Sequence, residues 1–241
     1  MTLSGKKALV TGGTRGIGRE ITRALARSGA DVLTCYRRDE EHASSLVREL
    51  KAIPGDHHVV QADLAQENDI VSLIDECRTR LGTLDIIVNC AGAISHRPFS
   101  ELKTEEWRRV LDTNLTAACL VIQNALPLLS GNASIINIGS RVATVGIPLR
   151  AHYTAAKAGL IGLTRSLCKE LGPAGIRVNV IAPGVIATEA ELPPEVVKRY
   201  EGMTALHRLG KPADVAAVAV FLASDASGYV TGATIDVDGG I

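Results

Sequence analysis

Residues 7–18 read Lys7-Ala-Leu-Val-Thr-Gly-Gly-Thr-Arg-Gly-Ile-Gly18. The apolar residues 8–10 predict a buried strand. Apolar side chains at 17, 21 and 25 predict a helix because they recur at intervals of four. The glycines between the two elements allow a tight turn, let the backbone approach a pyrophosphate, and lead into a helix start with free N–H groups. Their spacing, G-x-x-x-G-x-G, differs from the G-x-G-x-x-G of many dehydrogenases. The stretch predicts a phosphate-binding loop.

Strand-like and helix-like segments alternate along the rest of the chain. We expect strands at 31–35, 58–61, 84–88, 133–138, 176–181 and 234–237, and helices at 40–51, 68–81, 104–129, 154–171 and 212–223. Alternation of this kind produces right-handed βαβ units and one parallel sheet with helices on both faces. The prediction is an α/β fold, a Rossmann-type doubly wound sheet in a single domain over residues 1–241. A short substrate lid is expected at about 187–211.

Composition and charge narrow the class of protein. Basic and acidic residues balance at 26 each, so no field of one sign attracts nucleic acid or an anionic membrane, and neither partner is expected. The five cysteines form no C-x-x-C pair and are expected to be free thiols in a reducing compartment, with no metal site. No secretory segment or apolar run of ~18 residues is present, which favours a cytoplasmic location.

The end of the second expected strand bears on the choice of nucleotide. Tyr36 stands where an NAD-binding domain usually places an acidic residue for the ribose 2′-hydroxyl. Arg37 and Arg38 follow it, and Arg15 in the glycine loop lies on the same side. A guanidinium pairs well with a 2′-phosphate, so NADPH is the expected cofactor. The alternative is that these arginines are solvated surface residues.

Three polar residues suggest acid–base chemistry. Tyr153 and Lys157 are four residues apart at the start of an expected helix, so they share one face. Ser140 follows the strand at 133–138, and the carboxyl ends of such strands border the ligand crevice. A free phenol has a pKa of about 10, and a nearby ammonium group lowers that pKa toward neutrality. The three residues therefore predict a site in which Tyr153 exchanges a proton with a substrate.

Taken together, the motifs resemble those of the short-chain dehydrogenase/reductase family, and most of all its 3-oxoacyl-carrier-protein reductase type, over residues 4–240. The matching motifs are Thr11–Gly18, Ala62-Asp63-Leu64, Asn89-Cys90-Ala91-Gly92, Asn114, Ser140, Tyr153-Thr-Ala-Ala-Lys157, Arg177-Val-Asn179, Pro183-Gly184 and Val237-Asp-Gly-Gly240. One residue departs from the family pattern: Cys90 stands where an asparagine is usual. We expect little effect if that position works through its backbone.

The resemblance implies a role for each matching residue. Tyr153 protonates the carbonyl oxygen, Lys157 lowers the Tyr153 pKa and holds the nicotinamide ribose, and Ser140 orients the carbonyl. Asn114 supports a water that relays protons to Lys157. Contacts to the cofactor are implied for Gly12, Thr14, Arg15, Ile17, Gly18, Tyr36, Arg37, Arg38, Asp63, Leu64, Cys90, Ala91, Gly92, Tyr153, Lys157, Pro183, Gly184, Ile186 and Thr188.

The substrate is less clear from the sequence. Docking of an acidic carrier protein needs basic surface, and residues 126–133 and 172–175, where relatives of that type carry it, hold no Lys or Arg. The sequence thus favours an NADPH-dependent carbonyl reductase, or alcohol dehydrogenase, acting on a small free ketone, cyclic or polyketide-type compounds included. The alternative is a 3-oxoacyl-carrier-protein reductase. A nucleotide-sensing module without turnover is disfavoured because both Tyr153 and Lys157 are present.

Two further expectations concern other surfaces. His96 and His152 are either hydrogen-bond donors to a substrate or packing residues, and the second interpretation is favoured. The helices at 104–129 and 154–171 and the segment 213–241 carry more apolar positions than one core-facing stripe needs. Such helices bury their second face against a partner, so we expect a homo-oligomer, with a homotetramer favoured.

Overall fold

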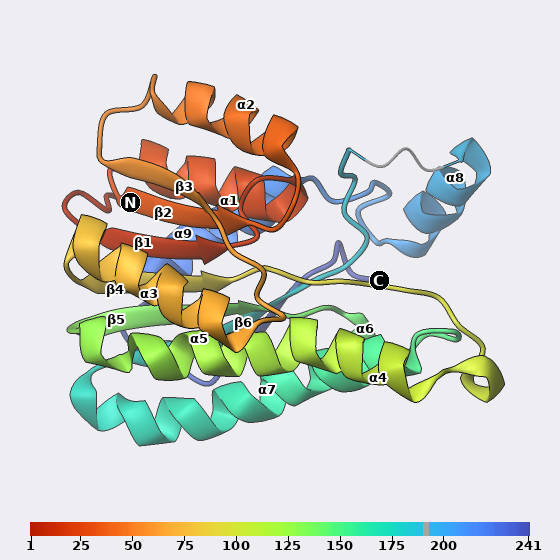
Figure 1. The fold of residues 1–241 in the computed structure, drawn as a ribbon. Helices are drawn as coiled ribbons and strands as arrows, with labels where there is room; N and C mark the ends of the chain where they lie inside the picture. The colour runs from red at the N-terminus through yellow and green to blue at the C-terminus, as the bar shows by residue number, and fades with distance from the viewer. Residues whose placement is uncertain (190–192) are drawn as a thin grey trace.

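The computed structural model describes residues 1–189 and 193–241. Within this part of the chain, seven strands form a parallel sheet in the order β3-β2-β1-β4-β5-β6-β7 (Figure 1). The strands are β1 (Lys7–Thr11), β2 (Asp31–Tyr36), β3 (His57–Gln61), β4 (Leu84–Asn89), β5 (Leu129–Ile138), β6 (Arg177–Pro183) and β7 (Thr234–Val237). The strand order reverses between β1 and β4, and ligands bind in such sheets outside the carboxyl ends of the strands at that reversal.

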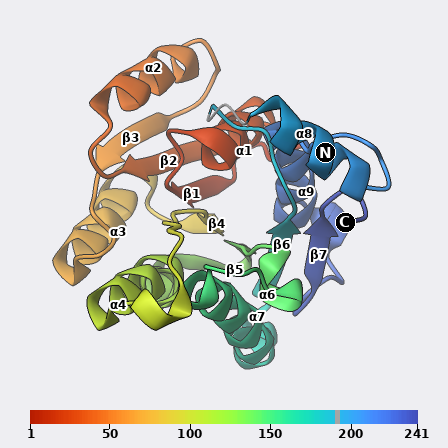
Figure 2. The same ribbon diagram turned by 90° about the vertical axis from the view of Figure 1, so that its right-hand side faces the viewer.

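Helices cover both faces of the sheet (Figure 2). They are α1 (Gly16–Arg27), α2 (Glu40–Leu50), α3 (Glu67–Leu81), α4 (Thr104–Leu111), α5 (Ala117–Ala125), α6 (Val142–Val145), α7 (Ala151–Leu171), α8 (Pro194–Met203) and α9 (Pro212–Ala223). Apolar residues of α1, α2 and α9 build one core cluster, and those of α3, α5 and α7 build the other. The predicted α/β fold, a doubly wound parallel sheet in a single domain, is confirmed.

The first strand shows why the sheet forms where it does. Leu9 packs into the cluster on the α3 and α5 side, whereas Ala8 and Val10 pack into the cluster on the α1 and α9 side. All three side chains are fully buried. A strand covered on both faces needs a continuous apolar run rather than an alternating one, and residues 8–10 supply it.

The long helix expected at 104–129 is interrupted and ends early. A π-helical turn, Asp112–Thr116, separates α4 from α5, and the α-helix ends at Ala125. A 3₁₀ turn, Leu126–Leu128, follows, and Leu129 already belongs to β5. Pro127 accounts for the ending because proline has no N–H to continue the helical hydrogen bonds.

The segment expected to form a lid contains a helix that the sequence analysis did not predict. Helix α8 begins at Pro194, where the fixed φ of proline suits the first turn. Residues 190–192 of the segment lie outside the described residues. The remaining expected helices and strands agree with the structure to within three residues at each end, apart from β5, which begins four residues earlier than expected. The function of the segment as a lid stays a prediction.

One other feature was expected from the sequence. Each of the five cysteines is a free thiol. No helix in residues 1–189 and 193–241 combines the length and the apolar character that crossing a membrane would require.

Candidate active site

A cleft of about 1020 Å³ opens at the carboxyl edge of the sheet. Its walls come from the segments that follow six strands: Gly12–Gly18 after β1, Tyr36–His42 after β2, Ala62–Ala65 after β3, Cys90–Ile94 after β4, Gly139 and Ser140 after β5, and Gly184–Glu189 after β6. Every residue that the sequence suggested for catalysis or cofactor binding lines this cleft. The structure thus brings the whole predicted set together, and the role of each residue stays a prediction.

The loop after β1 packs against the loop after β4 without room for side chains. Gly12 has a φ of +67°, and a Cβ atom there would lie 2.8 Å from the Cα of Ala91. The Thr11 hydroxyl oxygen accepts hydrogen bonds from the N–H groups of Cys90 (3.1 Å) and Ala91 (3.2 Å). These contacts fix the floor of the cleft with backbone atoms. They also explain why position 90 tolerates a cysteine, since its backbone makes the bond to the neighbouring loop.

The wall after β2 carries the arginines expected to choose the nucleotide. Arg37 and Arg38 are exposed at the cleft. The acidic residue that follows them, Asp39, is engaged elsewhere: it caps α2 by accepting from the His42 backbone N–H (3.1 Å) and lies 2.8 Å from the His42 ring nitrogen Nδ1. The hydrogen bonds with His42, and less strongly the charge of Arg15 at 3.7 Å, hold the pKa of Asp39 below its usual range. Asp39 is thus a helix cap beside a basic wall.

Helix α7 presents Tyr153 and Lys157 to the cleft from one face. The Lys157 Nζ lies 5.7 Å from the centre of the Tyr153 ring and donates to the carbonyl oxygen of Ile138 at 2.8 Å. Lys157 is almost completely buried, and burial lowers its pKa to about 8 although the neighbouring Cys90 opposes the change. Ser140 lies in the loop just after β5 and hydrogen-bonds the Tyr153 phenol.

The pKa of Tyr153 shifts in the opposite direction from the one expected. Burial raises this pKa, and the hydrogen bond with Ser140 and the charge of Arg150 lower it only in part. Lys157 does not lower the pKa of Tyr153 as expected. Its ammonium group donates to the Ile138 carbonyl oxygen, and burial makes this ammonium group lose its proton more easily. A raised pKa keeps the phenol protonated at neutral pH, which suits a group that donates a proton.

The π-helical turn places Asn114 at the back of the site. Its side chain is buried and its Nδ2 donates to the carbonyl oxygens of Ala93 (2.7 Å) and Val110 (2.9 Å). Its Oδ1 has no hydrogen-bond partner among the described residues. A Cβ atom on Gly92 would lie 2.8 Å from this oxygen and 3.8 Å from the Lys157 Nζ, so both atoms face the same glycine. A buried oxygen without a partner is a place where a water molecule would bind.

Cys90 is a poor nucleophile in this site. Burial raises its pKa to about 11, and the charge of Lys157 lowers it only in part. The reactive form of a cysteine is the thiolate, so this thiol is inert at neutral pH. Cys90, at the position where the resemblance led us to expect asparagine, therefore adds no reactive group to the site.

The two histidines considered as substrate donors are used to join loops. The Nε2 atom of His152 lies 2.7 Å from the Ser95 hydroxyl, and the side chain is fully buried. His96 accepts a hydrogen bond from the Arg150 side chain at 2.8 Å. Within the described part of the chain, neither histidine lines the cleft. Both contacts connect the loop after β4 to the start of α7, which favours the packing interpretation.

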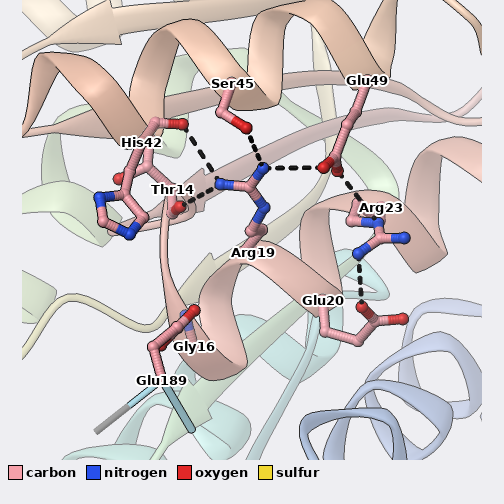
Figure 3. A network of polar contacts seen from close by, with 9 residues as sticks. All are labelled: Thr14, Gly16, Arg19, Glu20, Arg23, His42, Ser45, Glu49 and Glu189. Atoms are coloured by element: carbon pink, nitrogen blue, oxygen red, sulfur yellow. Dashed lines mark hydrogen bonds and ion pairs between the residues drawn. The ribbon is translucent and has the colours of Figure 1, made fainter.

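Some residues of the cleft had no signal in the sequence. Glu189, in the loop after β6, accepts a hydrogen bond from the N–H of Gly16 at 2.8 Å (Figure 3). Burial raises the pKa of Glu189, but this hydrogen bond and others lower it more, so the carboxylate stays charged at the start of α1. The other residues of the cleft that no sequence pattern pointed to are Cys35, Asp39, His42, Ala65, Ala93, Thr113, Ile138 and Gly139. Most of them are neighbours in the chain of residues that were predicted.

Comparison with known proteins agrees with this geometry. A family model described as enoyl-(acyl carrier protein) reductase matches residues 12–241. The chain is 41% identical over 240 residues to the 3-oxoacyl-[acyl-carrier-protein] reductase FabG of Staphylococcus aureus, with 98% of each chain covered. It is 38% identical, with the same coverage, to the reductase of that name from Staphylococcus epidermidis.

Solved structures extend the comparison to the fold. A short-chain dehydrogenase from Burkholderia cenocepacia in complex with NADP superposes with a TM-score of 0.95 at 33% identity, covering 100% of this chain and 99% of that one. A blue fluorescent protein from a metagenomic library in complex with NADPH gives a TM-score of 0.95 at 36% identity and the same coverage. The chain belongs to the short-chain dehydrogenase/reductase family of oxidoreductases.

Proposed function

We propose that the chain is an NADPH-dependent 3-oxoacyl-carrier-protein reductase, which reduces the ketone at C3 of a 3-oxoacyl thioester. The observation that carries the reaction type is the convergence of Tyr153, Lys157 and Ser140 beside the glycine loop in one cleft. The carrier-bound substrate is supported by 41% identity, over almost the whole of both chains, to a reductase named for it. The small free ketone favoured from the sequence alone has no such support.

The residues of the cleft fit a dinucleotide phosphate. At Gly12 a Cβ would collide with the neighbouring backbone, so the loop offers its main chain to a ligand. The N-terminus of α1 would hold the pyrophosphate, and Arg15, Arg37 and Arg38 would hold the 2′-phosphate. Other contacts are proposed as the resemblance implied them: Asp63 and Leu64 to adenine, Cys90 to Gly92 to the adenosine ribose, and Pro183 to Thr188 to the nicotinamide. NADPH would supply the hydride.

The protein's own part in the reaction is to orient the ketone and give it a proton. The Ser140 hydroxyl would hold the carbonyl oxygen beside the Tyr153 phenol. Tyr153 would donate its proton to that oxygen as negative charge develops there. A raised phenol pKa means that Tyr153 starts each reduction protonated. Lys157 and a water on the Asn114 Oδ1 would return a proton to Tyr153.

The lack of basic residues at 126–133 and 172–175 does not count against a carrier-bound substrate. Residues 126–133 run into the first half of β5, and residues 172–175 lead into β6, so both stretches lie at the amino edge of the sheet. The cleft lies at the opposite edge, so basic residues at these two places would not help a carrier to reach the cleft of the same chain. The loop after β4 carries the exposed Arg97, and Arg150 lies just before α7. Arg141, after β5, is already paired with Asp236 and Asp238. The charges of Arg97 and Arg150 suit an acidic carrier.

The experiment that tests this function is NADPH oxidation, followed by absorbance, with three kinds of substrate. These are a 3-oxoacyl chain on its carrier protein, the same chain on a short thiol, and a panel of free ketones. We expect the carrier-bound substrate to have the highest kcat/KM. A free ketone with the highest kcat/KM would restore the alternative, and failure of every carbonyl compound would refute the proposal of a reductase.

The homotetramer expected from the sequence also stays a proposal, together with the cytoplasmic location. Several of the apolar residues that suggested it, including Ala117, Val121 and Leu160, are buried in the chain's own core. Leu126 and Tyr229 remain exposed. We expect light scattering coupled to size exclusion to give a mass near four times the 25.4 kDa of one chain. A mass near that of a single chain would contradict the proposal.

A further inference from the structure

Helix α1 carries a buried arginine that the proposed reaction does not use. The guanidinium of Arg19 lies between α1 and α2, and only 14% of its side chain is exposed (Figure 3). One nitrogen donates to the carbonyl oxygens of Thr14 (3.1 Å) and His42 (3.3 Å). The other donates to the Ser45 hydroxyl and to the Glu49 carboxylate, both at 2.9 Å. Arg19 therefore joins the glycine loop to α2, with contacts from its first turn (His42) to its last (Glu49).

The two segments that Arg19 joins form adjacent walls of the cleft. Thr14 is a buried member of the glycine loop that lines the cleft. Helix α2 directly follows the wall formed by Tyr36, Arg37 and Arg38. A hydrogen bond to the Thr14 carbonyl holds the loop from outside, on the side away from the ligand. Arg19 thus helps to set the distance between the pyrophosphate wall and the 2′-phosphate wall, together with the Arg15–Asp39 ion pair and the pairing of β1 with β2.

We propose that Arg19 is a positioning residue for the cofactor: it holds the glycine loop in the shape that receives the pyrophosphate, without touching the nucleotide itself. The inference rests on the proposed use of NADPH. A loop that is already in its bound shape avoids the cost of ordering on binding, so it binds more tightly. Because NADPH and NADH share the pyrophosphate, loss of this support weakens both cofactors equally.

A neighbouring arginine provides a matched control. Arg23, one turn further along α1, contacts the other oxygen of Glu49 at 3.4 Å and Glu20 at 3.3 Å. Among the described residues, it makes no polar contact with the glycine loop. Arg19 and Arg23 therefore share Glu49 as an ion-pair partner, and only Arg19 reaches the Thr14 carbonyl.

The test compares Arg19→Met with Arg23→Met by fluorescence titration of NADPH and NADH, and by thermal melting of the protein alone. We expect Arg19→Met to raise both dissociation constants by about tenfold, equivalent to ~1.4 kcal/mol. For Arg23→Met we expect dissociation constants within about twofold of wild type, because its ion pairs within the described part of the chain are with Glu20 and Glu49 and not with the glycine loop. Ser45→Ala removes one of the hydrogen bonds that anchor Arg19 and should raise both constants by about threefold, because the bonds of Arg19 to Thr14, His42 and Glu49 remain.

Three results would overturn the proposal. One is a dissociation constant for Arg19→Met that equals that of wild type. Another is an equal rise for Arg23→Met, which would make the effect a general loss of stability. The third is a loss of NADPH binding with NADH unchanged, which would place the role at the 2′-phosphate. If Arg19→Met does not fold, Ser45→Ala takes its place. The dissociation constants of Ser45→Ala for NADPH and NADH are then compared with those of Arg23→Met, and the same three results would overturn the proposal. Failure of the wild-type chain to bind either cofactor would refute the proposed function instead.

Discussion

The two sides of the cleft are built differently. On the nucleotide side, the glycine loop is tied to α2 by the hydrogen bonds of Arg19. On the substrate side, the loops after β4 and β5 and the end of α8 expose large apolar side chains. They are Ile94, Phe99, Val145, Leu149 and Met203, each between 48% and 77% exposed. Apolar surface of this kind marks a place where an apolar ligand or partner binds. The nucleotide side is therefore complete in the single chain, whereas the substrate side offers a surface still to be covered.

The substrate side is nevertheless attached firmly to the catalytic helix. The Arg97 N–H donates to the Leu149 carbonyl oxygen at 2.9 Å, and His152 contacts Ser95 just before Tyr153. Leu149 has a φ of +67°, a left-handed backbone that is costly for a residue with a side chain. The loop after β4 and the start of α7 thus hold one another in place. Variation in the apolar surface can alter the choice of substrate without moving Tyr153.

Removing the Tyr153 hydroxyl should have the largest effect on activity. It also distinguishes the two sides of the cleft, because it changes catalysis and leaves the nucleotide side intact. We expect Tyr153→Phe to lower kcat by roughly 10²–10⁴-fold, because a general acid is lost. The dissociation constant for NADPH should hardly change, since the nucleotide side is intact. Stopped-flow kinetics and a binding titration check this, with the fully exposed Tyr229→Phe as the control. Turnover within about threefold of wild type would remove Tyr153 from the mechanism.

The charge of the buried Lys157 should lower the free energy of unfolding of the protein. Its pKa falls from an ordinary value of 10.5 to about 8, so below pH 8 the folded state bears the full cost of a buried charge. Between these two values, stability rises with pH because the unfolded chain holds the proton that the folded chain has lost. We expect Lys157→Met to abolish activity and to raise the free energy of unfolding at neutral pH by ~1–3 kcal/mol.

Thermal melting and urea unfolding measure this change, with the exposed Lys51→Met as the control. The hydrogen bond from Lys157 to Ile138 is lost in the variant, which offsets part of the gain. A variant less stable than wild type at neutral pH would show that the contacts of the ammonium group fully offset the cost of burying its charge.

The choice of nucleotide should respond to Arg37. We expect Arg37→Asp to lower the ratio of NADPH to NADH efficiency by about 10–100-fold, because a charge-assisted contact of ~1.5–3 kcal/mol is lost. Arg48→Asp makes the same change of charge at an exposed position of α2 and should leave the ratio unchanged. Equal ratios for the two variants would mean that Arg37 is only a surface residue.

The sequence predicts the nucleotide side better than the substrate side. The strand at 7–11, the glycines and the pair at 153 and 157 are local patterns, and each falls in the cleft as expected. Helix α8 and the π-helical turn at Asn114 leave no such pattern. A π-helical turn depends on how the helix packs, and the apolar period continues across it.

Contacts between residues that lie far apart in the sequence could not be predicted from it either. Glu189 meets Gly16 across 173 positions, and Arg19 meets Glu49 only because α1 and α2 lie side by side. The direction of the Tyr153 pKa depends on burial, which the spacing of Tyr153 and Lys157 does not reveal. The identities of the residues in the site follow from the sequence, and their electrostatics require the fold.

We propose that this cleft brings a nicotinamide hydride to the C3 ketone of a 3-oxoacyl thioester. The most direct measurement uses NADPH deuterated at both hydrogens of the nicotinamide C4 and mass spectrometry of the product. We expect a 3-hydroxyacyl thioester with one deuterium, bound to carbon C3, and we expect Tyr153→Phe to form it roughly 10²–10⁴-fold more slowly. Product without deuterium, or no 3-hydroxyacyl product from the wild-type chain, would contradict it.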